Sequence, residues 1–271
     1  MRLIPRIRRL AGLGILIVAS CARHDAGQAV IREPDTASRL HVADTAAAAG
    51  QTDIALSMYN AAAAAAPDNV EAQTRLVSLL IKSGQPEVAG QVLSRALVRQ
   101  PSDPTLLRWL GNLRLETGAA EAALKIFDGL VARKSTNIAA LNGRGVALDL
   151  LGQHEVAQQT YRTAQTIAPG DVQTANNLAV SFLLSNRPTD ARDILVPLSQ
   201  QPDLPARVLN NLALAQTAAG DTSAADASLA GRAGADDLRI MAATLAGPGG
   251  YGLTTDLPAS PAARLSAKPA G

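Results

Sequence analysis

The stretch LRWLGNLRLETGAAEAALKIFDGLV (Leu107–Val131) decides the fold. Apolar residues recur at helical spacing on both sides of a lone glycine, Gly118, and a second glycine, Gly111, lies seven positions before it. Ala123 and Phe127 lie five and nine positions after Gly118. A glycine between two such segments can take the positive φ that ends one helix and lets the next begin. The stretch therefore predicts two helices joined by a tight turn.

The same pattern recurs along the chain with a period of 34 residues. The turn residues of the successive copies are Gly50, Gly84, Gly118, Gly152, Asn186 and Gly220. Every copy has alanine five positions after the turn residue, a large apolar residue nine positions after it and a small or short side chain seven positions before it. Small residues let two helices cross closely, and the large residues fill the space that is left. The spacing predicts an all-α protein in which helix-turn-helix units stack.

A 34-residue helical pair of this kind resembles the tetratricopeptide repeat (TPR), and six copies cover residues 36–231. The resemblance implies an all-α TPR solenoid of six helix-turn-helix repeats with a C-terminal capping helix, because terminal repeats of such arrays need a polar outer face. We expect residues 235–246 to form this capping helix. Residues 247–271 contain GPGGYG and several prolines, which are typical of a disordered tail.

The composition argues against nucleic-acid binding and against a large enzyme core. Aromatic residues make up only 2% of the chain, which favours closely packed alanine-rich helices. Four of the 25 basic residues lie in the first 20 positions, where no acidic residue occurs. Removal of that segment would leave 21 basic and 23 acidic side chains, so the net charge of +2 reflects the leader. We expect no nucleic-acid partner.

The single cysteine, Cys21, follows a basic segment and a short apolar run, Leu10–Ala19. Val18-Ala19-Ser20-Cys21 resembles the lipobox of bacterial lipoproteins, in which the cysteine is lipidated. A transmembrane anchor is the alternative, but the apolar run is shorter than the roughly 20 residues that a spanning helix needs. We expect a signal peptide at residues 1–20, lipidation of Cys21 and a tether at residues 21–35. In lipoproteins, alanine rather than aspartate after the cysteine, here Ala22, favours an outer-membrane lipoprotein that faces the periplasm.

Residue patterns for chemistry are incomplete. His154-Glu155 begins a zinc-binding HExxH pattern, but Gln158 stands where the second histidine should be. The glycine-rich segment 247–252 lacks the Lys-Ser/Thr of a phosphate-binding loop. We therefore expect no catalytic residues, no metal, no cofactor and no small-molecule substrate.

Three asparagines form the strongest candidate site. Asn142, Asn176 and Asn210 each lie ten positions before their turn residue, a position that faces the concave groove in TPR stacks. An amide side chain can donate to and accept from the backbone of an extended peptide. Val180, Leu183, Leu184 and Leu214 are predicted to make the nearby groove apolar, which suits an amphipathic partner segment. The alternative is that these asparagines simply lie on polar helix faces.

The sequence of the later repeats resembles one particular family of TPR proteins. Two NNLA segments (176–179 and 210–213), ILVPL (194–198) and LPARVLNNLALAQ (204–216) are similar to the TadD family of TPR lipoproteins of the tight-adherence (Flp) pilus. This resemblance implies a scaffold in outer-membrane pilus or secretion assembly, whose protein partners include the secretin or other pilus assembly components. Two other classes stay open: an envelope scaffold for cell-wall or outer-membrane assembly, and an enzyme carried on the solenoid.

Overall fold

The computed structural model describes residues 35–229, and every regular element within this range is an α-helix. The helices pair into six helix-turn-helix units, which confirms the predicted all-α TPR solenoid fold. Their bounds are α1 Thr36–Ala48, α2 Thr52–Ala65, α3 Val70–Lys82, α4 Pro86–Arg99, α5 Pro104–Glu116, α6 Ala120–Arg133, α7 Ile138–Leu150, α8 His154–Ile167, α9 Val172–Leu184, α10 Pro188–Leu198, α11 Ala206–Ala218 and α12 Thr222–Leu229.

The turn inside each unit has the geometry that the glycine row predicts. Gly84 and Gly118 have φ angles of 72° and 77°, and Asn186 takes φ 55° in place of a glycine. The residue that follows the turn residue then donates its N–H to a carbonyl near the end of the first helix. In the second unit, for example, the Gln85 N–H donates to the Leu80 carbonyl at 2.9 Å. An equivalent bond occurs in all six described units. This is the Schellman arrangement, which satisfies the carbonyls at the end of the first helix.

The first helix of five units begins at an aspartate or asparagine that caps it. The Asn137 Oδ1, for example, accepts the Ala140 N–H at 3.1 Å at the start of α7. The capping residues are Asp35, Asn69, Asp103, Asn137 and Asp171. Such a cap contributes about 1 kcal/mol to helix stability. The repeating unit is therefore bounded by a side-chain cap at one end and by a positive-φ turn in its middle.

Aromatic side chains of the second helices fit against glycines of the first helices. The buried ring of Phe127 on α6 lies against Gly111 of α5 and Gly143 of α7. A Cβ atom added at Gly143 would lie 2.3 Å from that ring, and one at Gly111 would lie 2.6 Å from it. Tyr161 is the equivalent residue of α8, and a Cβ atom added at Gly145 of α7 would lie 2.4 Å from its ring. The ring thus has room only where the facing helix carries no side chain.

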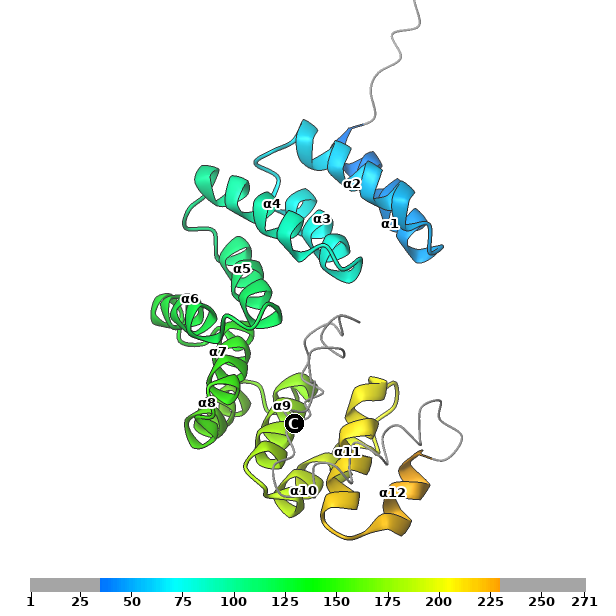
Figure 1. The fold of residues 1–271 in the computed structure, drawn as a ribbon, viewed down its shortest axis with the longest axis vertical. Helices are drawn as coiled ribbons and strands as arrows, with labels where there is room; N and C mark the ends of the chain where they lie inside the picture. Colours follow the sequence, from blue (N-terminus) through cyan, green and yellow to red (C-terminus); the bar gives the residue numbers. More distant parts are fainter. Residues whose placement is uncertain (1–34, 230–271) are drawn as a thin grey trace, which may run out of the picture. The chain divides into compact units, whose positions relative to one another are not determined.

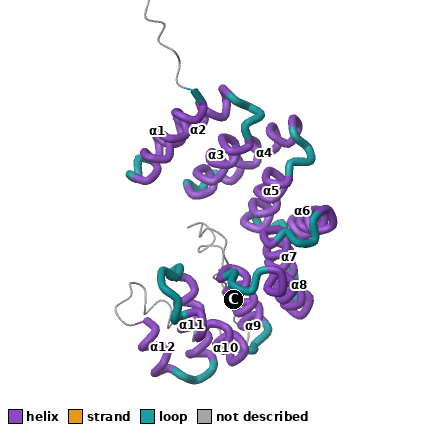
Figure 2. The backbone as a smooth tube through the Cα atoms, turned by 180° about the vertical axis from the view of Figure 1, so that it is seen from behind, coloured by secondary structure: helices purple, strands orange, loops and turns teal. Residues whose placement is uncertain are grey.

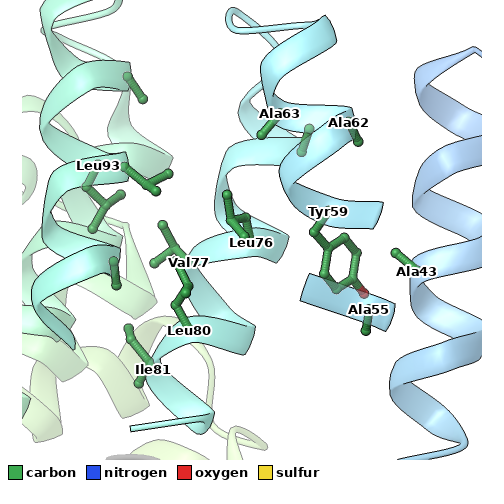
Figure 3. Close-up of a cluster of buried hydrophobic side chains, with 14 of the residues drawn as sticks. Ala43, Ala55, Tyr59, Ala62, Ala63, Leu76, Val77, Leu80, Ile81 and Leu93 are labelled. Carbon is green, nitrogen blue, oxygen red and sulfur yellow. The ribbon is translucent and has the colours of Figure 1, made fainter. Parts of the chain in front are cut away.

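The same register holds the earlier units together (Figure 3). Tyr59 of α2 points toward Ala43 of α1, and Val77 of α3 lies opposite Leu93 of α4. The alanines five positions after the turn residues are all 0–2% exposed, as the predicted close helix crossings require. They are Ala55, Ala89, Ala123, Ala157, Ala191 and Ala225.

The odd-numbered helices lie on the inner side of the stack and the even-numbered helices on the outer side (Figures 1 and 2). Successive odd-numbered helices from α3 to α11 also contact one another directly. Arg144 of α7 points outward, since its guanidinium donates to Asp128 of α6 at 2.7 Å and to Thr160 of α8 at 2.7 Å. The opposite side of α7 therefore faces inward.

The link between the fifth and sixth units departs from the pattern. Helix α10 contains Pro197 and ends at Leu198, so it is shorter than the other second helices from α2 to α8. Asp203 stands where three other units have a proline and takes φ 58°. Pro205 then precedes α11 without giving it a side-chain cap. The connection between the fifth and sixth units is thus longer than each of the four connections between earlier units.

Several predicted segments lie outside the described residues. These are the signal peptide (1–20), the tether (21–35) apart from Asp35, the capping helix (235–246) and the tail (247–271). Between residues 35 and 229, no helix combines the length and the apolar character that crossing a membrane requires.

The contact between Phe127 and Gly143 yields a stability prediction. Gly143→Ala should lower the free energy of unfolding by about 1 to 3 kcal/mol, because the added methyl overlaps a buried ring that cannot move away. Gly129→Ala is the matched control, since Gly129 lies inside α6 with no neighbouring atom within 4 Å of the added Cβ. It should raise stability by about 0.5 to 1 kcal/mol. Chemical denaturation of the two variants measures both effects, and equal shifts would contradict the assigned packing.

Candidate functional site

The inner face is defined here by the residues ten, six and two positions before the turn residue of each odd-numbered helix. On α7 these are Asn142, Val146 and Leu150, on the side opposite Arg144. Their spacing of four residues brings them onto one side of the helix. The same three positions recur on every odd-numbered helix, so the inner face consists of columns of side chains that cross the stack.

The three predicted asparagines differ in their surroundings. Asn142 is 5% exposed, and its Nδ2 donates to the Thr174 Oγ1 of the next unit at 2.8 Å. Asn176 has no exposed surface, and its Oδ1 accepts a hydrogen bond from the Asn211 Nδ2 at 2.9 Å. Asn210 is half-buried. The structure therefore differs from the expected ladder of three open amides: Asn142 and Asn176 bond between units, and Asn210 is the most accessible of the three.

Three amide atoms in this region are buried without a hydrogen-bond partner. They are the Oδ1 of Asn142, the Nδ2 of Asn176 and the Nδ2 of Asn177. An unsatisfied buried polar atom costs about 1 to 3 kcal/mol, so such atoms are uncommon in folded proteins. They lie on α7 and α9 and have no contact with solvent, so a bound segment cannot reach them in this arrangement of the helices.

The four predicted apolar residues form a surface that is partly covered by the protein itself. Val180 and Leu214 are 5% and 3% exposed, whereas Leu183 and Leu184 are half-buried. We call these four residues the apolar patch. Leu150 extends it onto α7 with 37% exposure, and it was not predicted from the sequence although it shares the register of Leu184. A partner can therefore reach the patch mainly through Leu150, Leu183 and Leu184.

Comparison with known proteins agrees with this architecture. Two segments of the chain, residues 46–106 and 138–171, match family models of the tetratricopeptide repeat. The solved TPR protein TTC0263 from Thermus thermophilus is 24% identical, covers 65% of this chain and 97% of its own, and superposes with a TM-score of 0.57. These two segments therefore carry tetratricopeptide repeats, and the described residues have the fold of a TPR solenoid. This repeat is a scaffold for protein–protein interactions.

Other similar proteins share the fold of this TPR protein at lower identity. PilW, a type IV pilus biogenesis factor, is 17% identical over 72% of this chain and 91% of its own, with a TM-score of 0.62. The pilF protein of Pseudomonas aeruginosa is 14% identical over 72% and 90%, with a TM-score of 0.56. An uncharacterised Sinorhizobium fredii protein, y4yS, is 26% identical over 65% of this chain and 82% of its own.

A second polar cluster links two TPR units behind the inner face. The buried carboxylate of Asp149 accepts hydrogen bonds from the Ser181 Oγ at 2.7 Å and the Tyr161 hydroxyl at 3.1 Å. Its Oδ1 also lies 2.9 Å from the His154 Nδ1. Burial raises the pKa of the Asp149 carboxyl, and the hydrogen bonds from His154, Ser181 and Tyr161 oppose that rise.

This cluster contains a serine, a histidine and an aspartate, but it does not have the order of a hydrolase triad. The Ser181 hydroxyl donates to Asp149 rather than to the histidine that would have to activate it. Ser181 is also fully buried, so a substrate has no access to it. His154 therefore serves a structural contact instead of completing the HExxH pattern, and the described residues hold no group of three metal-ligating side chains.

The buried Asp149 predicts a pH-dependent stability. Its pKa is raised above the ordinary value of 3.8, so the folded state holds this proton more tightly than the unfolded state does. The stabilisation is complete below pH 3.8 and is lost as the pH rises through the folded-state pKa. Asp149→Asn cannot titrate, so wild type should lose stability relative to this variant across that interval. Chemical denaturation of both proteins at a series of pH values tests this, and a difference that does not change with pH would contradict it.

Proposed function

We propose that this TPR protein is a lipid-anchored scaffold that holds a protein partner on its inner face during assembly of a Flp/tight-adherence type pilus or secretion system. The observation that carries the proposal is the set of partly exposed leucines on α7 and α9, namely Leu150, Leu183 and Leu184. A partner segment with apolar side chains would bury these leucines.

The apolar patch sets the character of the partner. Leu183 and Leu184 lie on α9 near its turn, and Leu150 is in the equivalent region of α7. Because α7 and α9 contact each other, a segment that crosses these two helices meets a leucine on each. An amphipathic segment of a folded or extended partner fits this arrangement better than a charged surface does.

The lipid anchor comes from the sequence alone. Cys21 closes a segment that resembles a lipobox, and it lies outside the described residues. We propose that the mature chain begins at this cysteine and that its acyl chains hold the TPR stack at the periplasmic side of the outer membrane. Several acyl chains on one residue anchor a protein stably, whereas one chain binds only marginally.

The pilus assignment rests on the resemblance to the TadD family, with NNLA segments at 176–179 and 210–213. PilW and pilF, both of which share the fold, bear names from pilus biogenesis, although identities of 17% and 14% carry the fold alone. We propose the secretin or an associated assembly component as the partner. Recovery of cell-wall enzymes or outer-membrane assembly proteins instead would favour a different envelope scaffold.

Anchoring is tested by Cys21→Ser in the native host. The variant should lose its lipid and leave the outer-membrane fraction, because serine offers no thiol for acylation. Membrane fractionation and mass spectrometry of the N-terminal peptide measure the change. A serine variant that fractionates like wild type would rule out the lipoprotein assignment.

Partner binding is tested by Leu184→Asp on the inner face. A carboxylate in the middle of an apolar contact should reduce partner capture about tenfold or more, since an unpaired charge is costly to bury. Asn210→Ala should weaken capture only a few-fold, in keeping with about 0.5 to 1.5 kcal/mol for one hydrogen bond. Affinity purification of the lipidated protein from membranes, with quantification of the co-purified secretin and assembly proteins, provides the measurement.

Val196→Asp is the matched control for this experiment. Val196 is an apolar residue that is 41% exposed, and it lies on the outer helix α10. Its substitution should leave capture unchanged. If Leu184→Asp folds normally and captures the same partners as well as wild type does, the inner face is not the binding surface.

A further inference from the structure

The inner face changes character at α5, where it becomes charged. The register positions of Asn142, Val146 and Leu150 are occupied on α5 by Arg108, Asn112 and Glu116. All three side chains on α5 are half-buried. Because neighbours are four positions apart, they form one row along the helix, and the two charged residues lie about 12 Å apart along its axis. We call Arg108, Asn112 and Glu116 the α5 row.

The α5 row lies on the inner side of its helix. On α5, Gly111 faces the ring of Phe127 on α6, and Leu113 lies 3.5 Å from the position of a Cβ on Gly90 of α4. Arg114 lies between those two directions and lines a hollow against α4. The α5 row is on the remaining side, away from both outer helices.

Neither charge of the row is neutralised within the described part of the chain. Some arginines there pair with acids, such as Arg75 with Asp44 and Arg99 with Asp68 at 2.5 Å. Arg108 forms no ion pair among residues 35–229 and only stacks on the Trp109 ring, with 5.7 Å between the guanidinium carbon and the ring centroid. Glu116 likewise has no ion pair or hydrogen bond among those residues.

Both groups are nevertheless partly removed from water. Burial lowers the pKa of the Arg108 guanidinium and raises the pKa of the Glu116 carboxyl, and in each case no neighbouring charge contributes. A charge in bulk water needs no partner, but a half-desolvated charge gains from one. The two residues are about 12 Å apart along the helix axis, and they form no ion pair with each other.

We propose that the α5 row is a binding subsite for a protein segment that carries one acidic and one basic side chain. The acidic side chain pairs with Arg108 and the basic side chain pairs with Glu116. The inference rests on the proposed use of the inner face for a partner, and it adds the chemistry of that partner. Asn112 lies between the charges and offers an amide to the backbone of the same segment.

The subsite and the apolar patch give the partner two kinds of contact. The patch on α9 and α11 binds apolar side chains without fixing which segment is chosen. The opposite charges on α5 select among amphipathic segments, because a like charge placed opposite either group is unfavourable. The preferred partner is therefore amphipathic and carries both signs of charge on the face that meets α5.

The test uses the purified chain and fluorescent peptides on one alternating Ser/Leu frame. The peptides differ only at two positions four residues apart, which in an extended chain lie on one face at about 13 Å. The pairs at these positions are Glu/Lys, Glu/Glu, Lys/Lys and Gln/Gln. Wild type should bind the Glu/Lys peptide about tenfold or more tightly than the Gln/Gln peptide, and the difference should shrink at high salt.

Charge reversal should switch this preference. Arg108→Glu makes the row wholly acidic, so the Lys/Lys peptide should become the tightest ligand, and Glu116→Lys should select the Glu/Glu peptide. A purely structural role for either residue could lower all affinities but could not exchange their order. Arg114→Glu is the control on the same helix, because Arg114 is exposed and lies on the other side of α5. It should retain the wild-type order.

Equal affinity of wild type for all the peptides, absence of binding, or an unchanged order in Arg108→Glu would each overturn the subsite. None of these outcomes affects partner capture through Leu184, which is measured separately with membranes. Conversely, capture that is insensitive to Leu184→Asp would reject the proposed binding surface on α9 while the charge switch on α5 could still be observed. The two proposals can therefore fail independently.

Discussion

The contact of a large ring with a residue that has no side chain governs the rest of this structure. Phe127 fits against Gly111 and Gly143 only because neither has a Cβ, and Tyr161 repeats the contact at Gly145. A ring that packs between the first helices of two units fixes the distance between them and their rotation about their axes. That rotation determines which positions of α5 and α7 face inward. The packing of α6 and α8 therefore sets which residues of α5 and α7 belong to the inner face.

The same constraint explains why so much of the fold could be predicted from the sequence. Glycine at a positive φ, alanine at a helix crossing and an aromatic or leucine nine positions later are local requirements, and each recurs every 34 residues. Asn186 could replace glycine because its side chain tolerates φ 55°. The shortened α10 was not anticipated, since Pro197 lies inside a helix that the period would have continued.

The candidate site was harder to predict because the period gives a position and not its surroundings. Asn142, Asn176 and Asn210 share one register, yet Asn176 is fully buried and bonds to Asn211, whereas Asn210 is half-buried. Whether an amide in this column is open depends on the residue that the next unit places beside it. Sequence spacing alone cannot rank such neighbours. The charged pair on α5 was overlooked for a related reason: its isolation from other charges is a property of three-dimensional packing.

The hydrogen bonds between units also connect stability with binding. Asn142 reaches Thr174 of the next unit, and Ser181 reaches back to Asp149, so α7 and α9 are held together by polar groups directly beneath the inner face. Polar contacts of this kind are directional, and they fix one arrangement of neighbouring helices more strictly than apolar packing does. The same layer contains buried amide atoms without hydrogen-bond partners, and these lower the stability of that arrangement. A segment bound across Leu150 of α7 and Leu184 of α9 would bridge the same two units, so binding and the rigidity of the later repeats should increase together.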